Sequence, residues 1–404
     1  MADKEQILRR YNEAVERIQN FHIRNIGDNP GPCCLISTTY PGVWLEHAFD
    51  GVCYGRLFGG EVGKQVAKNQ MLLFLRNQRE DGRLPFRVLD PSLIRGNSDH
   101  RKAVGYNQIQ ECVSFGRLCL EAYELCGDRD FLQEAYERLT RWDEWLCANR
   151  MTSHQGLIEL FCLFDTGHDN SARFSDVDNQ CPDDYGTVPV QGDMLPILAS
   201  DLNAVFFGDR MALSDMARML GRADEALLWQ QRAEAVRSKM FELLYDKDDA
   251  FFYDVDARGQ KRKFLSIAIS NVFTEKVLTQ GEFDVIYNRH MKNPEEFWTA
   301  WPFPSMAVNS ECIRNHAPSN CWGYFSQALT ALRCQRWMDD YGAGRDYDVL
   351  LEKWVDRLAT AQRPFTQEID PLTGHMTDCS VYYSSAMLLY IYAVRRLGYI
   401  EDTD

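Results

Sequence analysis

Helical periodicity dominates this chain of 404 residues. Between residues 202 and 243, apolar side chains recur every three or four residues in two successive runs, which places each run on one face of a helix. Gly221 lies between the runs and offers a stop for the first helix. The pattern therefore predicts a helical hairpin with a short polar turn. An earlier stretch shows the same rhythm, with one helix from about Ile109 to Gly127 and a second that runs through Trp145.

Such helix pairs recur at intervals of roughly 40 to 50 residues, as expected for hairpins stacked around a ring. Further helices are expected at 3–20, 60–79, 265–276, 281–291, 322–340, 346–362 and 380–397. Strand signals are sparse, and the clearest is the run 250–256 with a turn at Gly259, which predicts a small β-hairpin. No Ser/Gly/Pro-rich linker or charge block marks a boundary. The sequence thus predicts one all-α domain, a helical toroid, over residues 1–404.

Composition bears on partners and compartment. The formal net charge of −15 disfavours nucleic acids and anionic membranes, because both bind basic surfaces, and favours neutral or weakly charged ligands. No apolar run approaches the length of a membrane span, and the charged N-terminus lacks the apolar segment of a signal peptide. The 13 cysteines show no zinc-binding spacing, which is typical of reduced thiols in a cytoplasmic protein without a metal site. A homo-oligomer stays open.

The polar chemistry concentrates in segment 164–174, which reads Phe-Asp-Thr-Gly-His-Asp-Asn-Ser-Ala-Arg-Phe. Two carboxyl groups, those of Asp165 and Asp169, share one turn with a flexible glycine, and aromatic side chains flank the turn. A carboxyl group in such a dry environment has a raised pKa and can donate a proton near neutral pH. The alternative interpretation is a loop whose Asp, Asn and Ser side chains cap helices.

This segment resembles the Glu-Ser-Gly-x-Asp-Asn-Ser-Pro-Arg-Trp signature of glycoside hydrolase family 63 and its relatives, which include trehalases and mannosylglycerate or glucosylglycerate hydrolases. Asp169, Asn170 and Arg173 match the signature, and Asp165 takes the place of its Glu. The resemblance implies that Asp169 is the general acid and that Asp165, His168, Asn170 and Arg173 belong to the sugar site. It also implies an (α/α)-barrel of six helical hairpins with long loops at one end, and an inverting α-glycosidase that needs no organic cofactor.

Aromatic loops supply further candidates for the sugar site. Trp44 and Asp50 lie in segment 40–51, which resembles a Trp-x-x-Asp-x-Phe pattern of the same family. The indole would stack on a sugar face and the carboxylate would accept hydroxyl hydrogen bonds, although Trp44 equally fits a core position at a helix entrance. Gln110 and Glu111 are candidates in segment 106–111. At least one of three further tryptophans is expected in the site, namely Trp298, Trp301 and Trp322.

Segment 365–374, Phe-Thr-Gln-Glu-Ile-Asp-Pro-Leu-Thr-Gly, resembles the family's Phe-x-Glu-x-Tyr-x-Pro-x-Thr-Gly motif, whose Glu is the general base. Counting back from Pro371, the position of that Glu falls on Gln367, which cannot accept a proton. Glu368 lies one residue later and is the favoured base, although an extended strand would direct its side chain to the opposite face. The alternative bases are Glu46, Asp50 and Glu111.

These features favour a glycoside hydrolase that acts with inversion on a small α-linked glucoside or mannoside, either a disaccharide or a glycosyl-glycerate. Two other functions stay open. The same barrel hosts sugar 2-epimerases of the N-acylglucosamine type, which use histidines, and the chain has His47, His168 and His375 in or near its loops. The third function is a sugar-binding barrel that has lost catalysis at Gln367.

Overall fold

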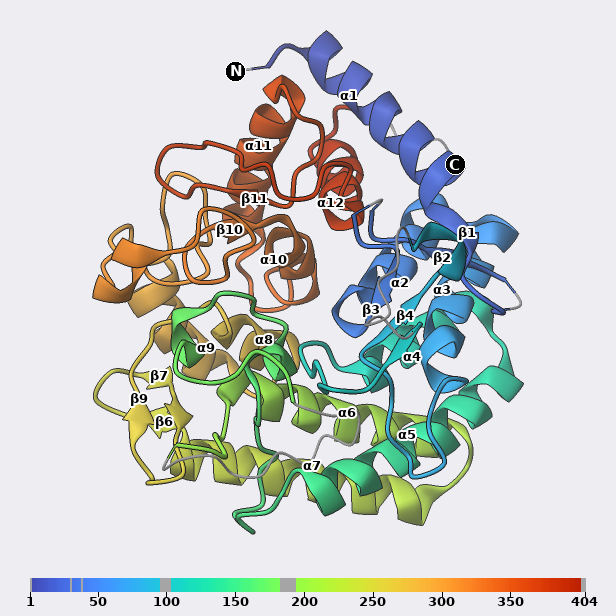
Figure 1. Cartoon of the computed structure of the whole chain (residues 1–404), viewed down its shortest axis with the longest axis vertical. Coiled ribbons are helices and arrows are strands. Elements are labelled where there is room, and N and C mark those ends of the chain that lie inside the picture. Colours follow the sequence, from blue (N-terminus) through green and yellow to red (C-terminus); the bar gives the residue numbers. More distant parts are fainter. Residues whose placement is uncertain (1, 30, 38, 95–102, 182–193, 401–404) are drawn as a thin grey trace.

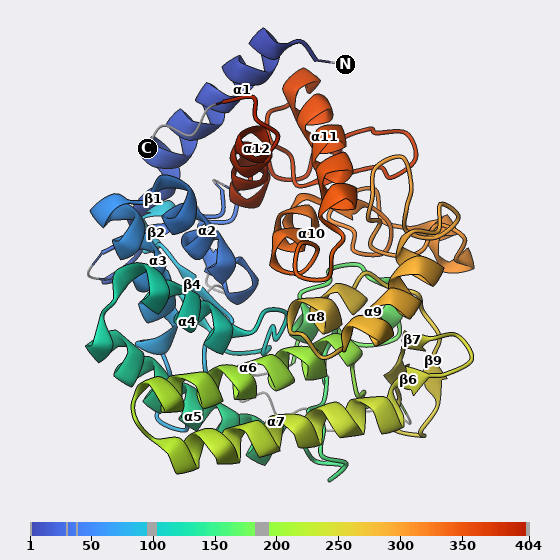
Figure 2. The same cartoon turned by 180° about the vertical axis from the view of Figure 1, so that it is seen from behind.

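The computed structural model describes residues 2–29, 31–37, 39–94, 103–181 and 194–400. Within these ranges, α-helices form a closed ring with short strands and long loops between them (Figure 1, Figure 2). None of the described helices is long and apolar enough to cross a bilayer. The helices are α1 (Lys4–Arg17), α2 (Ala48–Phe58), α3 (Gly60–Leu75), α4 (Phe115–Cys126), α5 (Arg129–Asn149), α6 (Ser200–Met219), α7 (Ala223–Leu243), α8 (Ile269–Thr274), α9 (Gln280–Ile286), α10 (Ala328–Arg333), α11 (Gly344–Thr360) and α12 (Ser384–Arg396).

The helices alternate between an inner and an outer layer. Even-numbered helices follow one another around the centre, because α12 contacts α2, α2 contacts α4, α4 contacts α6, α6 contacts α8, and α10 contacts α12. Odd-numbered helices cover them from outside, as where α3 packs along α2 and α7 along α6 (Figure 1). The mostly helical ring expected from the periodicity is thereby confirmed.

Burial patterns follow from these layers. Helix α6 is buried on nearly every face because it lies in the inner layer, whereas α7 buries one stripe that contains Ala226, Trp229 and Ala233. The N-cap of α5 is Asp128, whose side chain accepts hydrogen bonds from the N–H groups of Asp130 and Phe131.

Short antiparallel strands tie the loops together. The hairpin β8–β9 turns through Gly259, whose φ is +77°, and it confirms the β-hairpin expected in this segment. Two other pairings bear on the site, because β3 pairs with β4 and β10 pairs with β11. The strands are β1 (Ile23–Asn25) with β2 (Pro32–Cys34), β3 (Gly42–Trp44) with β4 (Arg87–Leu89) and β5 (Val104–Gly105), β6 (Tyr245–Asp246) with β7 (Phe251–Phe252), β8 (Asp254–Val255) with β9 (Lys261–Arg262), and β10 (Ser326–Gln327) with β11 (Glu368–Ile369).

Three segments differ from the helices expected from the sequence. Residues 48–58 form α2, where no helix was expected. Residues 109–114 are not helical, and α4 starts only after Ser114, whose hydroxyl accepts the N–H of Arg117. The helix expected at 322–340 is shorter, because residues 322–327 form turns and β10 before α10 and residues 337–340 form turns after it. The two segments without the expected helix, 109–114 and 322–327, contribute side chains to the cavity described next.

Candidate active site

Loops from distant parts of the chain meet around a small cavity of about 80 Å³. Aromatic rings and polar side chains alternate in its wall. The residues that line it are Tyr40, Trp44, Glu46, His47, Phe86, Arg87, Gln108, Gln110, Phe164, Gly167, Asp169, Gln180, Asn320, Trp322, Gln367 and Tyr383.

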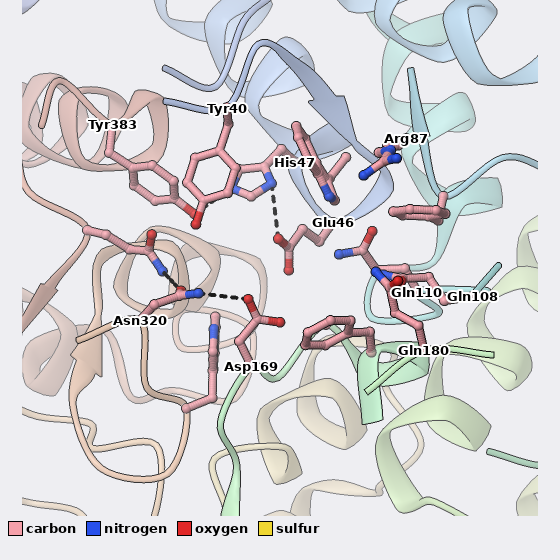
Figure 3. A pocket seen from close by; sticks show the side chains of 16 residues that line it. Tyr40, Glu46, His47, Arg87, Gln108, Gln110, Asp169, Gln180, Asn320 and Tyr383 are labelled. Atoms are coloured by element: carbon pink, nitrogen blue, oxygen red, sulfur yellow. Dashed lines mark hydrogen bonds and ion pairs between the residues drawn. The ribbon is translucent and has the colours of Figure 1, made fainter. Parts of the chain in front are cut away.

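Polar side chains form two opposite ends of this cavity. Figure 3 shows one end formed by Arg87, Gln108, Gln110 and Gln180, and the other by Tyr40, His47, Asn320 and Tyr383. Glu46 and Asp169 lie between the ends, with their carboxyl groups directed into the same space (Figure 3). They are the two acidic residues among the described residues of the wall. The centre of the cavity is therefore acidic.

Asp169 follows a tight turn that begins with the 3₁₀ segment Leu163–Thr166. Gly167 ends this segment with a φ of +69°, and its carbonyl accepts the N–H of Asp169. The side chain of Asp169 accepts a 2.8 Å hydrogen bond at Oδ2 from Asn320 Nδ2. Burial raises the pKa of Asp169 to about 6, although the bond from Asn320 favours the charged form. Asp169 therefore holds its proton up to mildly acidic pH.

Glu46 lies in the short turn Leu45–His47 between β3 and α2. Its carboxyl group packs against Gly167, where a Cβ atom would come within 2.7 Å of Glu46 Oε2. Burial raises the pKa of Glu46 to about 8, with Arg333 opposing the rise and Asp169 adding to it. The two carboxyl groups thus titrate apart, and the pair holds one proton between about pH 6 and pH 8.

His47 joins Glu46 to the opposite end of the cavity. Its Nδ1 lies 3.4 Å from Glu46 Oε1, and its Nε2 is hydrogen-bonded to the hydroxyl of Tyr383. Burial holds the pKa of His47 well below its usual range, and nearby Arg333 lowers it further. The imidazole is therefore neutral at physiological pH, with one ring nitrogen that donates and one that accepts.

Arg173 and His168 support the loop that carries Asp169. The buried guanidinium of Arg173 forms ion pairs with Asp201 at 2.7 Å and with Asp254 at 2.9 Å. Its Nη1 also lies 3.2 Å from Nδ1 of His168, and the His168 ring stacks on Trp322 with ring centroids 4.5 Å apart. Only Trp322 of this group lines the cavity. Arg173 and His168 were expected in the sugar site and instead lie behind its wall.

Three acidic residues that the sequence suggested lie outside the cavity wall. Asp165 is buried, and although burial opposes it, the Arg150 guanidinium 2.6 Å away lowers the pKa of Asp165. Asp50 is buried in α2 and accepts hydrogen bonds from the hydroxyl groups of Ser384 and Ser385. Glu111 is buried beside Asp209 of α6, and burial raises its pKa well above the usual range. None of these three carboxyl groups lines the cavity.

Asn170, Trp298 and Trp301 also lie away from the cavity wall. Asn170 is exposed, with a φ of +56°, and its side chain donates to the carbonyl of Asn320. Trp298 packs edge to face on Phe303. Trp301 packs against Gly374, where its indole leaves no room for a Cβ atom. Of the three tryptophans proposed as alternatives, the structure brings Trp322 to the cavity, and Trp44 lies in its wall as well.

Gln367 and Glu368 are adjacent in the sequence, and both side chains form hydrogen bonds with Asn320 and Gln327. Gln367 lines the cavity, and its Nε2 donates to Asn320 Oδ1 at 3.1 Å. Glu368 is fully buried and does not line the cavity. Its carboxylate accepts hydrogen bonds from the N–H groups of Asn320 and Cys321, from Gln327 Nε2 and from the Thr377 hydroxyl, at 2.7 to 3.1 Å. The favoured base of the sequence interpretation is thus held by hydrogen bonds behind the wall.

Several residues of the wall carry no signal in the sequence. Arg87, Gln180 and Tyr383 reach the cavity from segments without a recognisable motif. Their common feature is convergence in three dimensions, because each comes from a different loop or strand end. Asn320 has a left-handed backbone with a φ of +49°, which Asn tolerates better than most residues, and this geometry is visible only in the structure.

One cluster among the described residues offers several ligand atoms to a metal ion. Cys162, Asp165 and Cys181 place these atoms within 4.8 Å of one another. The oxygens of Asp165 already accept hydrogen bonds from Arg150 and from the N–H groups of Ile109, Phe161 and Cys162. Because Arg150 already pairs with the carboxylate that would attract a metal ion, we assign no metal to the cluster.

A profile of the mannosylglycerate hydrolase MGH1-like glycoside hydrolase domain matches residues 59–384. The chain belongs to this glycoside hydrolase family. The fold is also that of a glycoside hydrolase family 63 mannosylglycerate hydrolase from Thermus thermophilus in complex with Tris, with a TM-score of 0.75 at 17% identity over 95% of this chain and 100% of that one. The same enzyme in complex with Tris and D-glycerate aligns with a TM-score of 0.74 at 18% identity over 96% and 100%.

Neutral trehalase Nth1 from Saccharomyces cerevisiae shares the fold at greater distance. It aligns with a TM-score of 0.66 at 12% identity over 94% of this chain and 76% of that one. None of the curated protein sequences matches the chain. These structural matches establish the (α/α)-barrel architecture. Their sequence identities are too low to transfer a substrate or the reacting groups to this chain.

Proposed function

We propose that this protein hydrolyses a small α-linked glucoside or mannoside with inversion, on a single (α/α) barrel of six helical hairpins. Asp169 is the general acid and Glu46 is the second carboxyl group. The observation that carries the proposal is that these two carboxyl groups face the same space in the cavity and titrate apart. Of the four acids that the sequence offered as the base, Glu46 is the one in the cavity wall.

Inverting hydrolysis requires one protonated carboxyl group at the leaving oxygen and one carboxylate that activates water. In the protein alone, Glu46 holds the proton that the pair retains near neutral pH. Hydroxyl groups of a bound sugar, or the attacking water, donate to Glu46 and thereby lower its pKa, which moves the proton to Asp169. Asp169 then gives this proton to the leaving oxygen as the glycosidic bond breaks. Glu46 accepts a proton from the water while the oxygen of that water bonds to the anomeric carbon.

The two ends of the cavity suit the two halves of a small substrate. Trp44 and Trp322 present flat apolar faces of the kind that stack on sugar rings, and Gln367 lines the same cavity. Arg87 and three glutamines at one end suit a polar or negatively charged aglycone. A structural relative has been solved with D-glycerate, which is such a group. We therefore propose a glycosyl-glycerate as the substrate class to be tested first.

The test is cleavage of mannosylglycerate, glucosylglycerate and small α-disaccharides by the wild type, Asp169→Asn and Glu46→Gln. Loss of an acid or base costs on the order of 10² to 10⁴ in rate. Asp176→Asn is the matched control, because Asp176 lies near the same loop but is exposed and paired with Arg262. We expect this control to keep wild-type activity.

Two reagents separate the roles of the carboxyl groups. A glycosyl fluoride needs little protonation of its leaving group, so Asp169→Asn should retain activity on this substrate. The azide ion attacks without a general base, so added azide should restore the activity of Glu46→Gln. The opposite pattern would exchange the two roles, and full activity of Glu46→Gln would remove Glu46 from the reaction. Sugar binding without cleavage would favour the binding barrel with Gln367 in its wall, and a change at C2 without cleavage would favour an epimerase.

A further inference from the structure

Behind Asp169 the structure contains a continuous row of amide groups, of which Gln327 and Gln367 are buried and Asn320 is half-buried. Gln327 Nε2 donates to Glu368 Oε2 at 2.9 Å, and Gln367 Nε2 donates to Gln327 Oε1 at 3.4 Å. The same Gln367 nitrogen donates to Asn320 Oδ1 at 3.1 Å, and Asn320 Nδ2 donates to Asp169 Oδ2 at 2.8 Å. The row joins the fully buried carboxylate of Glu368 to the acid in the cavity wall.

The direction of every bond in this row follows from its buried end. Both oxygens of Glu368 accept from backbone N–H groups, those of Asn320 and Cys321, which can only donate. Gln327 must therefore present its NH₂ group to Glu368, and the same nitrogen also donates to the carbonyl of Cys321. Its amide oxygen is left to face Gln367. The orientation of Gln327 is thus set by partners that can only accept.

The same reasoning continues to Asp169. Gln367 must turn its NH₂ group toward the oxygen of Gln327, while its own oxygen accepts from the thiol of Cys379. Asn320 then receives a donor at its oxygen and turns its NH₂ group toward Asp169. Oδ2 of Asp169 is therefore an obligatory acceptor, and Figure 3 shows the second oxygen directed away from Asn320 into the cavity.

We propose that Glu368 is a positioning residue, which acts through Gln327, Gln367 and Asn320 to keep the proton of Asp169 on its cavity-facing oxygen. This inference rests on the proposed role of Asp169 as proton donor. An acid is useful only when its proton faces the leaving group, and the bond from Asn320 to Oδ2 favours the proton on the other, cavity-facing oxygen. The bond from Asn320 also moderates the pKa of Asp169, which burial alone would raise further.

The amide at position 367 is essential to this direction. A glutamate there would offer two acceptors, so Asn320 would have to turn its NH₂ group toward residue 367 and its oxygen toward Asp169. Asp169 could then face Asn320 only with a proton on Oδ2. Gln367→Glu should consequently raise the titration midpoint of Asp169 by more than the loss of a single hydrogen bond does.

The experiment is a titration of Asp169 by ¹³C NMR of full-length protein labelled at aspartate Cγ, with the resonance assigned by its absence in Asp169→Asn. This titration needs no substrate, so it tests the role of Glu368 even if none of the glycosides is hydrolysed. We expect a midpoint near 6 in the wild type. Asn320→Ala should raise it by about one unit, the usual effect of one hydrogen bond to a charged group.

The decisive variant is Gln327→Met, because Gln327 contacts Glu368 and Gln367 but neither Asp169 nor the cavity. We expect it to shift the Asp169 midpoint upward, in the same direction as Asn320→Ala. Thr377→Val is the matched control, since it also removes one donor to Glu368, at 2.8 Å, without interrupting the row. It should leave the midpoint of Asp169 where it is in the wild type.

An unchanged midpoint in Gln327→Met would overturn the proposal, and so would an equal shift in Thr377→Val, which would indicate general loosening around Glu368. If Gln327→Met does not fold, as judged by its circular dichroism and melting curve, Gln367→Met interrupts the next bond of the row and is subject to the same criteria. Gln367→Met should shift the Asp169 midpoint by at least as much as Gln327→Met.

Discussion

Replacing Arg173 by methionine should destabilise the barrel strongly. The change keeps most of the side-chain volume but leaves Asp201 and Asp254 buried without their cation. Removal of one partner from a buried ion pair costs about 3 to 5 kcal/mol. For 404 residues, an unfolding entropy of about 2.1 cal/mol/K per residue amounts to about 0.85 kcal/mol/K, so a loss of about 4 kcal/mol lowers the melting temperature by about 5 °C.

Differential scanning calorimetry at pH 7.5 measures this effect. Arg218→Met is the matched control, since Arg218 is 60% exposed and pairs with Asp215 on the surface of α6. Equal melting temperatures of Arg173→Met and wild type, or an equal loss in the control, would refute this account of the buried network.

Three further predictions concern the cavity and the core. Gly167→Ala and Gly156→Ala share the strain of a left-handed alanine, but only the former brings a Cβ atom within 2.7 Å of Glu46 Oε2. Calorimetric titration with a glycoside that binds in the cavity should therefore show weaker binding than in the wild type for Gly167→Ala but not for Gly156→Ala. Because the folded pKa values of Asp169 and Glu46, about 6 and about 8, exceed unfolded values near 4, stability should fall as the pH rises from 5 to 8. Melting curves of Glu46→Gln should show a flatter fall between pH 7 and pH 8. Burial raises the pKa of Glu111 too, so the melting temperature of Glu111→Gln relative to the wild type should increase as the pH rises.

The periodicity of the sequence predicted most of the outer layer of the barrel, because outer helices have one buried and one exposed face. Helix α7 shows this plainly in its stripe of Ala226, Trp229 and Ala233. Helix α2 was missed because residues 48–55 are buried on every side, which leaves no alternation to read. Helix α10 was overextended for a related reason, since the buried turns and strand before it are as apolar as a helix.

The site was predictable where a local motif carries it. The Asp-Asn-Ser segment pointed to Asp169, and the structure places this residue in the cavity wall. Arg87 and Asn320 could not be found in this way, because their place in the cavity depends on contacts between segments far apart in the chain.

The most direct test of the proposed reaction is the anomer released first from a small α-glycoside, followed by ¹H NMR during the first minutes of turnover. A pair of carboxyl groups that activates water on the face opposite the leaving group releases the β-anomer. We predict that the wild type releases the β-anomer first and that Asp169→Asn and Glu46→Gln release neither. An α-anomer as the first product, or unchanged release by either variant, would contradict the assignment of Asp169 and Glu46 as the hydrolytic pair.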